Sequence, residues 1–220
     1  MITLYALKQS RAYRIAWLLE LLELEYKLEL FERDNQTFLA PKALGEIHPL
    51  GKSPILKDGE LVLTESGAIV EYLLTRYDSQ HRFRPHVEST EYPNYLFWIH
   101  YAEGSLMPWL IMSVIFKRIN ARKMSFIARP IVHKLTATVM TNLIIPQLRT
   151  HLKYVEQSLA NKTWLLGGQL SGADIMMSFP LQAIARNSPL DLPNIRAYVE
   201  RLEQEPHFQL TEQKLGKFEL

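Results

Sequence analysis

Hydrophobic and polar positions follow different patterns in the two halves of this 220-residue chain. Over the first 76 residues, short strand-like apolar runs alternate with stretches in which apolar residues recur every three or four positions, which is typical of helices. The strand patterns are ITLYAL, YKLELF and the two runs PILK and ELVLT around Asp58-Gly59. The helix patterns cover 11–23 and 66–73, and a helix or an irregular turn lies near 38–45. The predicted order is β-α-β-α-β-β-α, a small sheet with helices packed against it.

The second half of the chain has helical periodicity throughout. A polar stretch without periodic apolar residues, YDSQHRFRPHVEST (77–90), separates the halves and is typical of a linker. Long apolar-periodic segments follow, and no convincing set of strands interrupts them. We therefore predict an α/β domain over residues 1–80 and an all-helical domain over residues 90–220.

One helix start in the second half carries its own signal. Ser171 and Asp174 in LSGADI match a capping box with Asp in place of the usual Glu or Gln, and Leu170 and Ile175 are placed as its hydrophobic staple. We expect a structural role for Ser171, and its replacement by Ala should cost ~1 kcal/mol without affecting chemistry.

Composition and charge exclude several function classes. The net charge of +2 comes without long basic runs, so nucleic acid is not an expected partner. The basic cluster FKRINARK (116–123) is interpreted as a solvated helix face. No apolar run approaches the ~20 residues of a membrane helix, and the start lacks the layout of a signal peptide. We expect a cytoplasmic protein without a membrane partner.

The chain contains no cysteine. This excludes disulfides, a cysteine nucleophile and thiolate metal sites within the chain. The seven histidines show no HExxH or other close ligand pair, so we expect no metal.

The predicted hairpin begins and ends in polar pairs. Each has an ordinary explanation, because Pro54 is tolerated at a strand start and Ser66 is a good helix N-cap. Together they suggest a clamp for a peptide. At one end, the helix N-terminus suits a carboxylate and Glu65 suits an ammonium, the two charges of an α-amino acid head group. At the other, the Ser53 main chain can pair with an extended peptide, and Lys52 can meet a second carboxylate.

These residues carry a resemblance to a known family. HPLGKSPIL followed by TESGAIVEYL closely resembles the glutathione transferases, and QSRAYR (9–14) and YAEGSL (101–106) are similar to segments of fungal and bacterial members. The resemblance covers nearly the whole chain. It implies a thioredoxin-like N-terminal domain, an all-α C-terminal domain and glutathione as co-substrate.

The resemblance also implies roles for the hairpin residues. Glu65 and Ser66 would hold the γ-glutamyl group, the main chain of Ser53 before a cis Pro54 would hold the cysteinyl part, and Lys52 would hold the glycine carboxylate. Many members have Val or Ile where Ser53 stands. That departure matters little if the contact is main-chain, and more if the side chain packs.

Activation of the thiol needs a further group. Lowering the thiol pKa from ~8.5 to ~6.5 takes about 2.7 kcal/mol. A helix N-terminus supplies at most ~2 kcal/mol, and one hydrogen bond to a charged acceptor supplies ~1.5–3 kcal/mol. Ser10 stands at the loop-to-helix junction, where both effects converge, although it could be a simple N-cap. Tyr5 is the alternative, and it fits a buried strand position equally well; Arg11 could add a positive field.

Two further sets of residues have competing interpretations. In related enzymes a carboxylate in the segment of Glu103 reaches across a dimer interface toward the γ-glutamyl ammonium; capping or solvation is the alternative. Met107, Trp109, Met112 and Phe116 could line a pocket for an apolar co-substrate, or belong to the core.

We therefore expect a cytoplasmic, homodimeric glutathione transferase with a role in detoxification. It would conjugate the thiolate to an apolar electrophile, or reduce an organic peroxide, without a metal or redox cofactor. There are two alternatives to an enzyme. One is a glutathione-binding regulatory protein with little turnover, and the other is a scaffold module.

Overall fold

The computed structural model of this chain describes residues 1–34 and 39–218. Its first half has the predicted order β-α-β-α-β-β-α. The elements are β1 (Ile2–Leu7), α1 (Ala12–Leu21), β2 (Tyr26–Phe31), α2 (Ala43–Ile47), β3 (Ile55–Asp58), β4 (Leu61–Leu63) and α3 (Ser66–Tyr77). The predicted start of the second helix at Phe38 lies outside the described residues.

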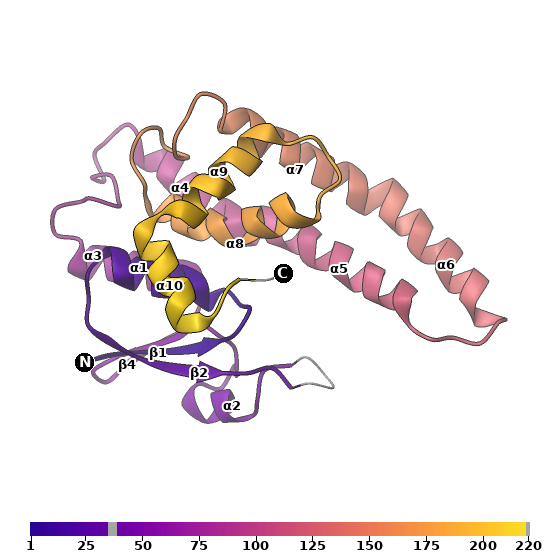
Figure 1. Cartoon of the computed structure of the whole chain (residues 1–220), viewed down its shortest axis with the longest axis horizontal. Helices are drawn as coiled ribbons and strands as arrows, with labels where there is room; N and C mark the ends of the chain where they lie inside the picture. The colour runs from indigo at the N-terminus through magenta and orange to yellow at the C-terminus, as the bar shows by residue number, and fades with distance from the viewer. Residues whose placement is uncertain (35–38, 219–220) are drawn as a thin grey trace.

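The four strands form one mixed sheet in the order β2-β1-β3-β4. β1 pairs with β2 in parallel and with β3 antiparallel, and β3 and β4 form the predicted hairpin. Figure 1 shows α1 and α3 on one face of this sheet and α2 on the other. Because of these directions, the ends of β1 and β4 and the start of β3 meet at one edge of the sheet.

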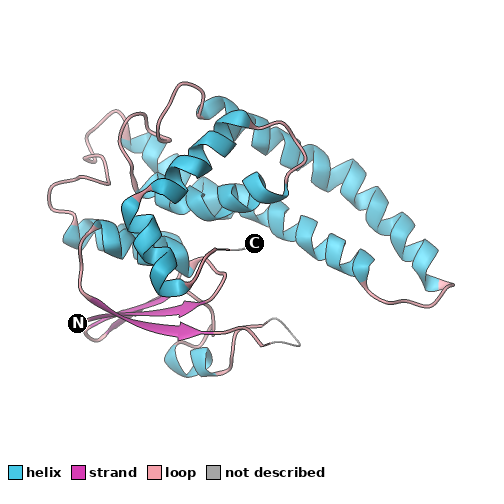
Figure 2. Cartoon of the chain, in the orientation of Figure 1, coloured by secondary structure: helices cyan, strands magenta, loops and turns pink. Residues whose placement is uncertain are grey.

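The second half is helical, as predicted (Figure 2). Its helices are α4 (Tyr92–Tyr101), η1 (Ala102–Leu106), α5 (Met107–Ala121), α6 (Ala128–Val139), η2 (Met140–Ile144), α7 (Ile145–Ser158), α8 (Gly172–Asn187), α9 (Pro193–Gln204) and α10 (Pro206–Leu215). The two η segments are single π-helical turns inside long helices, a local widening that is frequent at functional sites. Within the described residues, no helix is both long and apolar enough to span a bilayer.

The two halves share one hydrophobic core. Helix α1 is almost wholly buried, and it packs against α3, α8 and α10. The stretch between α3 and α4 is tied down as well, since the Asp78 carboxylate accepts hydrogen bonds from the Phe83 and Arg82 main-chain N–H groups, and the Phe83 carbonyl accepts one from Gly172. The residue boundaries of the two domains therefore stay a prediction.

The predicted capping box at the start of α8 is present. The Asp174 carboxylate accepts hydrogen bonds at 2.9 Å from both the main-chain N–H and the hydroxyl of Ser171. It also accepts from two groups that the motif did not indicate, the Leu165 N–H at 2.9 Å and the Tyr198 hydroxyl at 3.0 Å. Burial raises the pKa of Asp174 to about 6, while these four donors stabilise its ionised form.

Replacing Asp174 by Asn should lower the free energy of unfolding by about 2 kcal/mol. All four neighbours donate, so the amide NH2 would face a donor and leave buried groups unpaired. Urea denaturation measures this effect. Asp191→Asn is the control, because that side chain is 93% exposed and should change stability by less than about 0.5 kcal/mol. Equal effects of the two variants would contradict the buried network.

Candidate functional site

The edge of the sheet where β1 and β4 end brings both polar ends of the hairpin together. Leu56 of β3 lies opposite Leu63 of β4. The same register, continued by two residues, places Pro54 opposite Glu65. Lys52–Pro54 and Glu65–Ser66 therefore flank one place on the surface, as the clamp requires.

Ser53 connects this edge to the end of β1. Its hydroxyl accepts a hydrogen bond from the Leu7 N–H at 2.9 Å and donates to the Tyr5 carbonyl at 3.3 Å. The side chain thus occupies the place of the next β1–β3 ladder pair, and in the described part of the chain the Ser53 main-chain N–H and C=O make no hydrogen bond. The Ser53–Pro54 peptide bond is cis, as the resemblance implied.

Glu65 and Ser66 form the start of α3. Glu65 has φ 69° and ψ 117°, and its side chain is exposed. A residue other than glycine at such a φ costs ~1–3 kcal/mol, and residues of this kind cluster at ligand clamps. Ser66 is 3% exposed, and its hydroxyl oxygen has no hydrogen-bond partner. No acidic side chain lies in the first turn of α3, so its free N–H groups and an unpaired hydroxyl are left for an anion.

Lys52 supplies a cation at the same edge. Its side chain is exposed, and it makes no ion pair with any residue of 1–34 or 39–218. The ammonium is therefore available to a carboxylate from solvent.

Ser10 lies where α1 begins, and its hydroxyl is already committed. It donates to the Leu7 carbonyl at 2.6 Å and accepts from the Ala12 N–H at 3.2 Å, and the residue is 5% exposed. The main-chain N–H groups of Ser10 and Arg11 donate to nothing in the described chain. The hydroxyl therefore makes capping-type hydrogen bonds, and its role in binding the thiol stays a prediction. The two main-chain donors lie beside it.

Tyr5 lies elsewhere. Its strand neighbours Leu4 and Ala6 are fully buried in the core shared with α1, so the Tyr5 side chain points from the opposite face of the sheet. Its ring lies 6.5 Å from that of Phe31. The structure therefore does not bring Tyr5 to the start of α1.

Glu103 pairs with two arginines of the same chain. It forms an ion pair with Arg14, and its Oε1 lies 2.9 Å from Nε of Arg11. Burial acts to raise the pKa of Glu103, but Arg14 and Arg11 outweigh it and hold the pKa below its usual value. Both guanidinium groups lie over the Phe179 ring, at 5.7 and 5.4 Å from its centroid. A reach of Glu103 across a dimer interface stays a prediction.

Arg14 is a residue that the sequence reasoning missed. It is fully buried, burial lowers its pKa to about 10, and its Nε and Nη2 have no hydrogen-bond partner. The available signal was its place between Ala12 and Ile15, inside the apolar stripe of the first helix. Its charge is paired with Glu103, but Arg11 and Arg14 together exceed that carboxylate by one positive charge beside the start of α1.

The C-terminal segment was missed as well. The Gln9 side chain donates to the Lys217 carbonyl at 2.7 Å, and the Tyr13 hydroxyl donates to the Gly216 carbonyl at 2.8 Å. Phe218 is buried between the rings of Tyr13 and Phe179. The end of the chain thereby holds the loop that carries Ser10.

The co-substrate candidates divide between core and surface of α5. Met107 is buried in the core, whereas Trp109, Met112 and Phe116 are half-buried.

Arg33, just after β2, donates to the Gln9 carbonyl at 3.2 Å. Burial, and then the charges of Arg118 and Arg11, lower the pKa of Arg33. Positive charge therefore accumulates near the start of α1. Among the described residues, no cluster of His, Asp and Glu could hold a metal ion.

Comparisons with known proteins agree over both halves. The family model described as glutathione S-transferase, N-terminal domain matches residues 1–75, and the corresponding C-terminal domain model matches residues 144–206. Glutathione S-transferase 1 of Saccharomyces cerevisiae is 34% identical over 228 residues, covering 97% of this chain and 94% of the relative. Glutathione S-transferase 3 of Schizosaccharomyces pombe is 32% identical, covering 98% and 88%. The crystal structure of a glutathione S-transferase from Actinobacillus pleuropneumoniae superposes with a TM-score of 0.82 at 38% identity, covering 98% of this chain and 93% of that one.

Proposed function

The chain belongs to the glutathione S-transferase family, and from this premise we propose that it binds glutathione at the edge of the sheet and transfers it to an electrophile. The observation that carries the binding site is the start of α3. There, free helix N–H groups and the unpaired hydroxyl of Ser66 lie beside Glu65. An α-amino acid head group has the matching charges: its carboxylate suits the helix N–H groups and the Ser66 hydroxyl, and its ammonium suits Glu65.

The rest of the peptide extends from there along the edge. The free main-chain N–H and C=O of Ser53 would pair with the cysteinyl residue in the manner of an added strand. The exposed Lys52 would meet the glycine carboxylate. The sulfur would then lie at the start of α1, near Ser10.

The start of α1 favours the thiolate over the thiol. The main-chain N–H groups of Ser10 and Arg11 direct stabilising dipoles toward an anion. Arg11 and Arg14 together exceed the Glu103 carboxylate by one positive charge, which also favours an anion. The Ser10 hydroxyl contributes once it turns from the Leu7 carbonyl to the sulfur. The thiol proton leaves to solvent.

Transfer then follows from the lone pair of the thiolate. In a displacement, the sulfur forms a bond to the electrophilic carbon while the leaving group departs with its bonding electrons; in an addition, the substrate instead gains a proton. With an organic peroxide, the sulfur attacks the O–O bond and takes one oxygen to become a sulfenic acid, while the other oxygen leaves as the alcohol after gaining a proton. The thiol of a second glutathione then attacks the sulfenic sulfur, which gives the disulfide and releases water. A regulatory protein with little turnover is not favoured, since the relatives named above are transferases.

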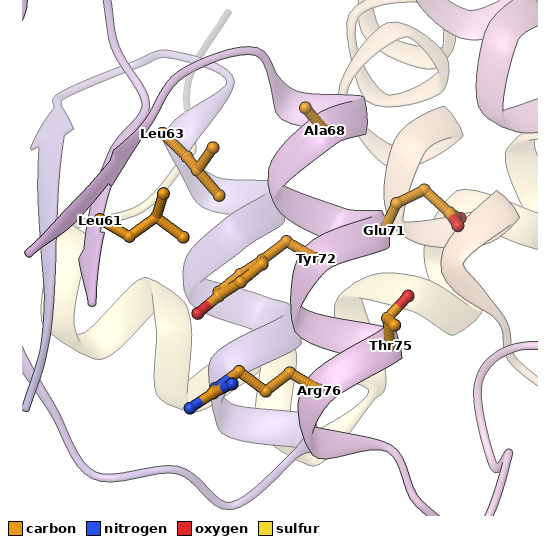
Figure 3. A pocket seen from close by; sticks show the side chains of 7 residues that line it. All are labelled: Leu61, Leu63, Ala68, Glu71, Tyr72, Thr75 and Arg76. Carbon is orange, nitrogen blue, oxygen red and sulfur yellow. The ribbon is translucent and has the colours of Figure 1, made fainter. Parts of the chain in front are cut away.

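A homodimer is part of this proposal. A mainly apolar hollow lies between β4 and α3 (Figure 3). Leu61, Leu63, Ala68 and Tyr72 line it, with Glu71, Thr75 and Arg76 along α3. On α4, the aromatic Phe97 is 40% exposed and suits such a hollow on a second copy. Sedimentation velocity measures whether the protein is a dimer in solution. The apolar co-substrate and the role in detoxification stay predictions from the family resemblance, and the cytoplasmic location stays a prediction from the sequence pattern.

Ser10→Ala should lower kcat/KM for conjugation of chlorodinitrobenzene about tenfold near neutral pH, because one hydrogen bond to the thiolate is lost. The pH at which activity is half-maximal should rise by about one unit. Tyr5→Phe is the control and should leave both values unchanged. An unchanged pH profile in Ser10→Ala would assign thiolate stabilisation to the main-chain N–H groups instead.

A further inference from the structure

The arm formed by α5 and α6 extends away from the body of the molecule (Figure 1). The basic segment FKRINARK occupies the end of α5 and the turn toward α6. Apart from Phe116 and Arg118, the function proposed above uses neither this segment nor α6. The tip of the arm therefore needs an explanation of its own.

Large apolar side chains are exposed at this tip. Phe126 is 86% exposed, Ile127 64%, Ile131 67% and Leu135 62%. The last three recur every four residues, so they form one stripe along α6. In a protein surrounded only by water, such a stripe is costly and marks a contact surface.

The charge of the arm has a single sign. Residues 104–155 contain eight Lys or Arg and no Asp or Glu. Six of the eight lie between Lys117 and Lys134, around the tip. At 100° per residue, Lys134 lies on the same face of α6 as Ile127 and Ile131. Apolar and cationic groups thus share one surface.

We propose that the tip of the arm docks on an anionic lipid bilayer. Helices that lie in a membrane interface combine Phe, Leu or Ile on one face with Lys and Arg that reach the headgroups. The anionic lipids of a cytoplasmic leaflet attract such a cationic segment. Contact between two arms is disfavoured, because it would bring together only positive charges. Such docking would replace two expectations from the sequence, namely that the protein has no membrane partner and that the basic segment is a solvated helix face.

Co-sedimentation of the full chain with vesicles tests the proposal. We expect binding to phosphatidylcholine vesicles that contain about 30% phosphatidylglycerol, and about tenfold weaker partitioning to pure phosphatidylcholine. Added salt should weaken the binding, since headgroup attraction is screened. Absence of binding, or equal binding to both vesicles, would overturn the proposal.

Variants separate the tip from the rest of the surface. Phe126→Asp with Ile131→Asp, and separately Lys123→Glu with Lys134→Glu, should each reduce partitioning about tenfold. Val87→Asp is the control, because Val87 is 57% exposed but lies between α3 and α4. All three variants should keep the conjugation activity of the wild type, which shows that they are folded. If the tip variants change the oligomeric state and leave vesicle binding intact, a second copy covers the stripe and the proposal is wrong.

Discussion

Glu65→Ala should raise the dissociation constant for glutathione about thirtyfold or more. Loss of a carboxylate that faces an ammonium in a ligand complex costs about 2–5 kcal/mol, much of it from leaving the partner charge unpaired. Glu65 suits that role because the backbone at φ 69° presents its side chain beside the start of α3. Alanine pays a similar backbone strain at this position, so the change isolates the side chain.

Isothermal titration calorimetry with glutathione measures the effect. Glu60→Ala is the matched control, since Glu60 is an exposed glutamate at the turn of the same hairpin. Its dissociation constant should equal that of the wild type. An unchanged value for Glu65→Ala would refute the clamp.

Arg14→Met should lower the free energy of unfolding by about 3 kcal/mol. Removing one member of a buried ion pair leaves the other uncompensated, and such losses reach ~3–5 kcal/mol. In Arg14→Met, Glu103 still forms an ion pair with Arg11, so we expect the lower end of this range. A second change, Glu103→Gln, should cost less in the Arg14→Met background than alone, because it removes the stranded charge.

Chemical denaturation of the two single variants and the double variant measures these terms. Arg11→Met is the control, because its side chain is 32% exposed and a partly exposed pair contributes ~1 kcal/mol or less. If Arg14→Met and Arg11→Met destabilise equally, the burial of Arg14 is not what stabilises this cluster.

The parts of the fold that follow from short-range signals were predictable. Asp58-Gly59 between apolar runs predicted the β3–β4 hairpin, and three-to-four residue periodicity predicted the helices of the second half. The capping box of Ser171 and Asp174 is equally local. In each case the residues that determine the structure lie within a few positions of one another.

The unpredicted features depend on residues far apart in the chain. Gln9 and Lys217 are hydrogen-bonded although 208 positions separate them, and Tyr198 completes the Asp174 network from another helix. Arg14 went unnoticed because a single cation on a helix is ordinarily solvated, and only packing against α8 and η1 buries it. The side-chain role of Ser53 likewise became visible only with the neighbouring strand in place.

A crystal structure of the protein with glutathione bound tests the account most directly. We predict the γ-glutamyl group at Glu65 and Ser66, the cysteinyl main chain paired with Ser53, and the sulfur within about 3.5 Å of the hydroxyl or main-chain N–H groups at the start of α1. Glutathione bound elsewhere, or its sulfur directed away from α1, would contradict the account.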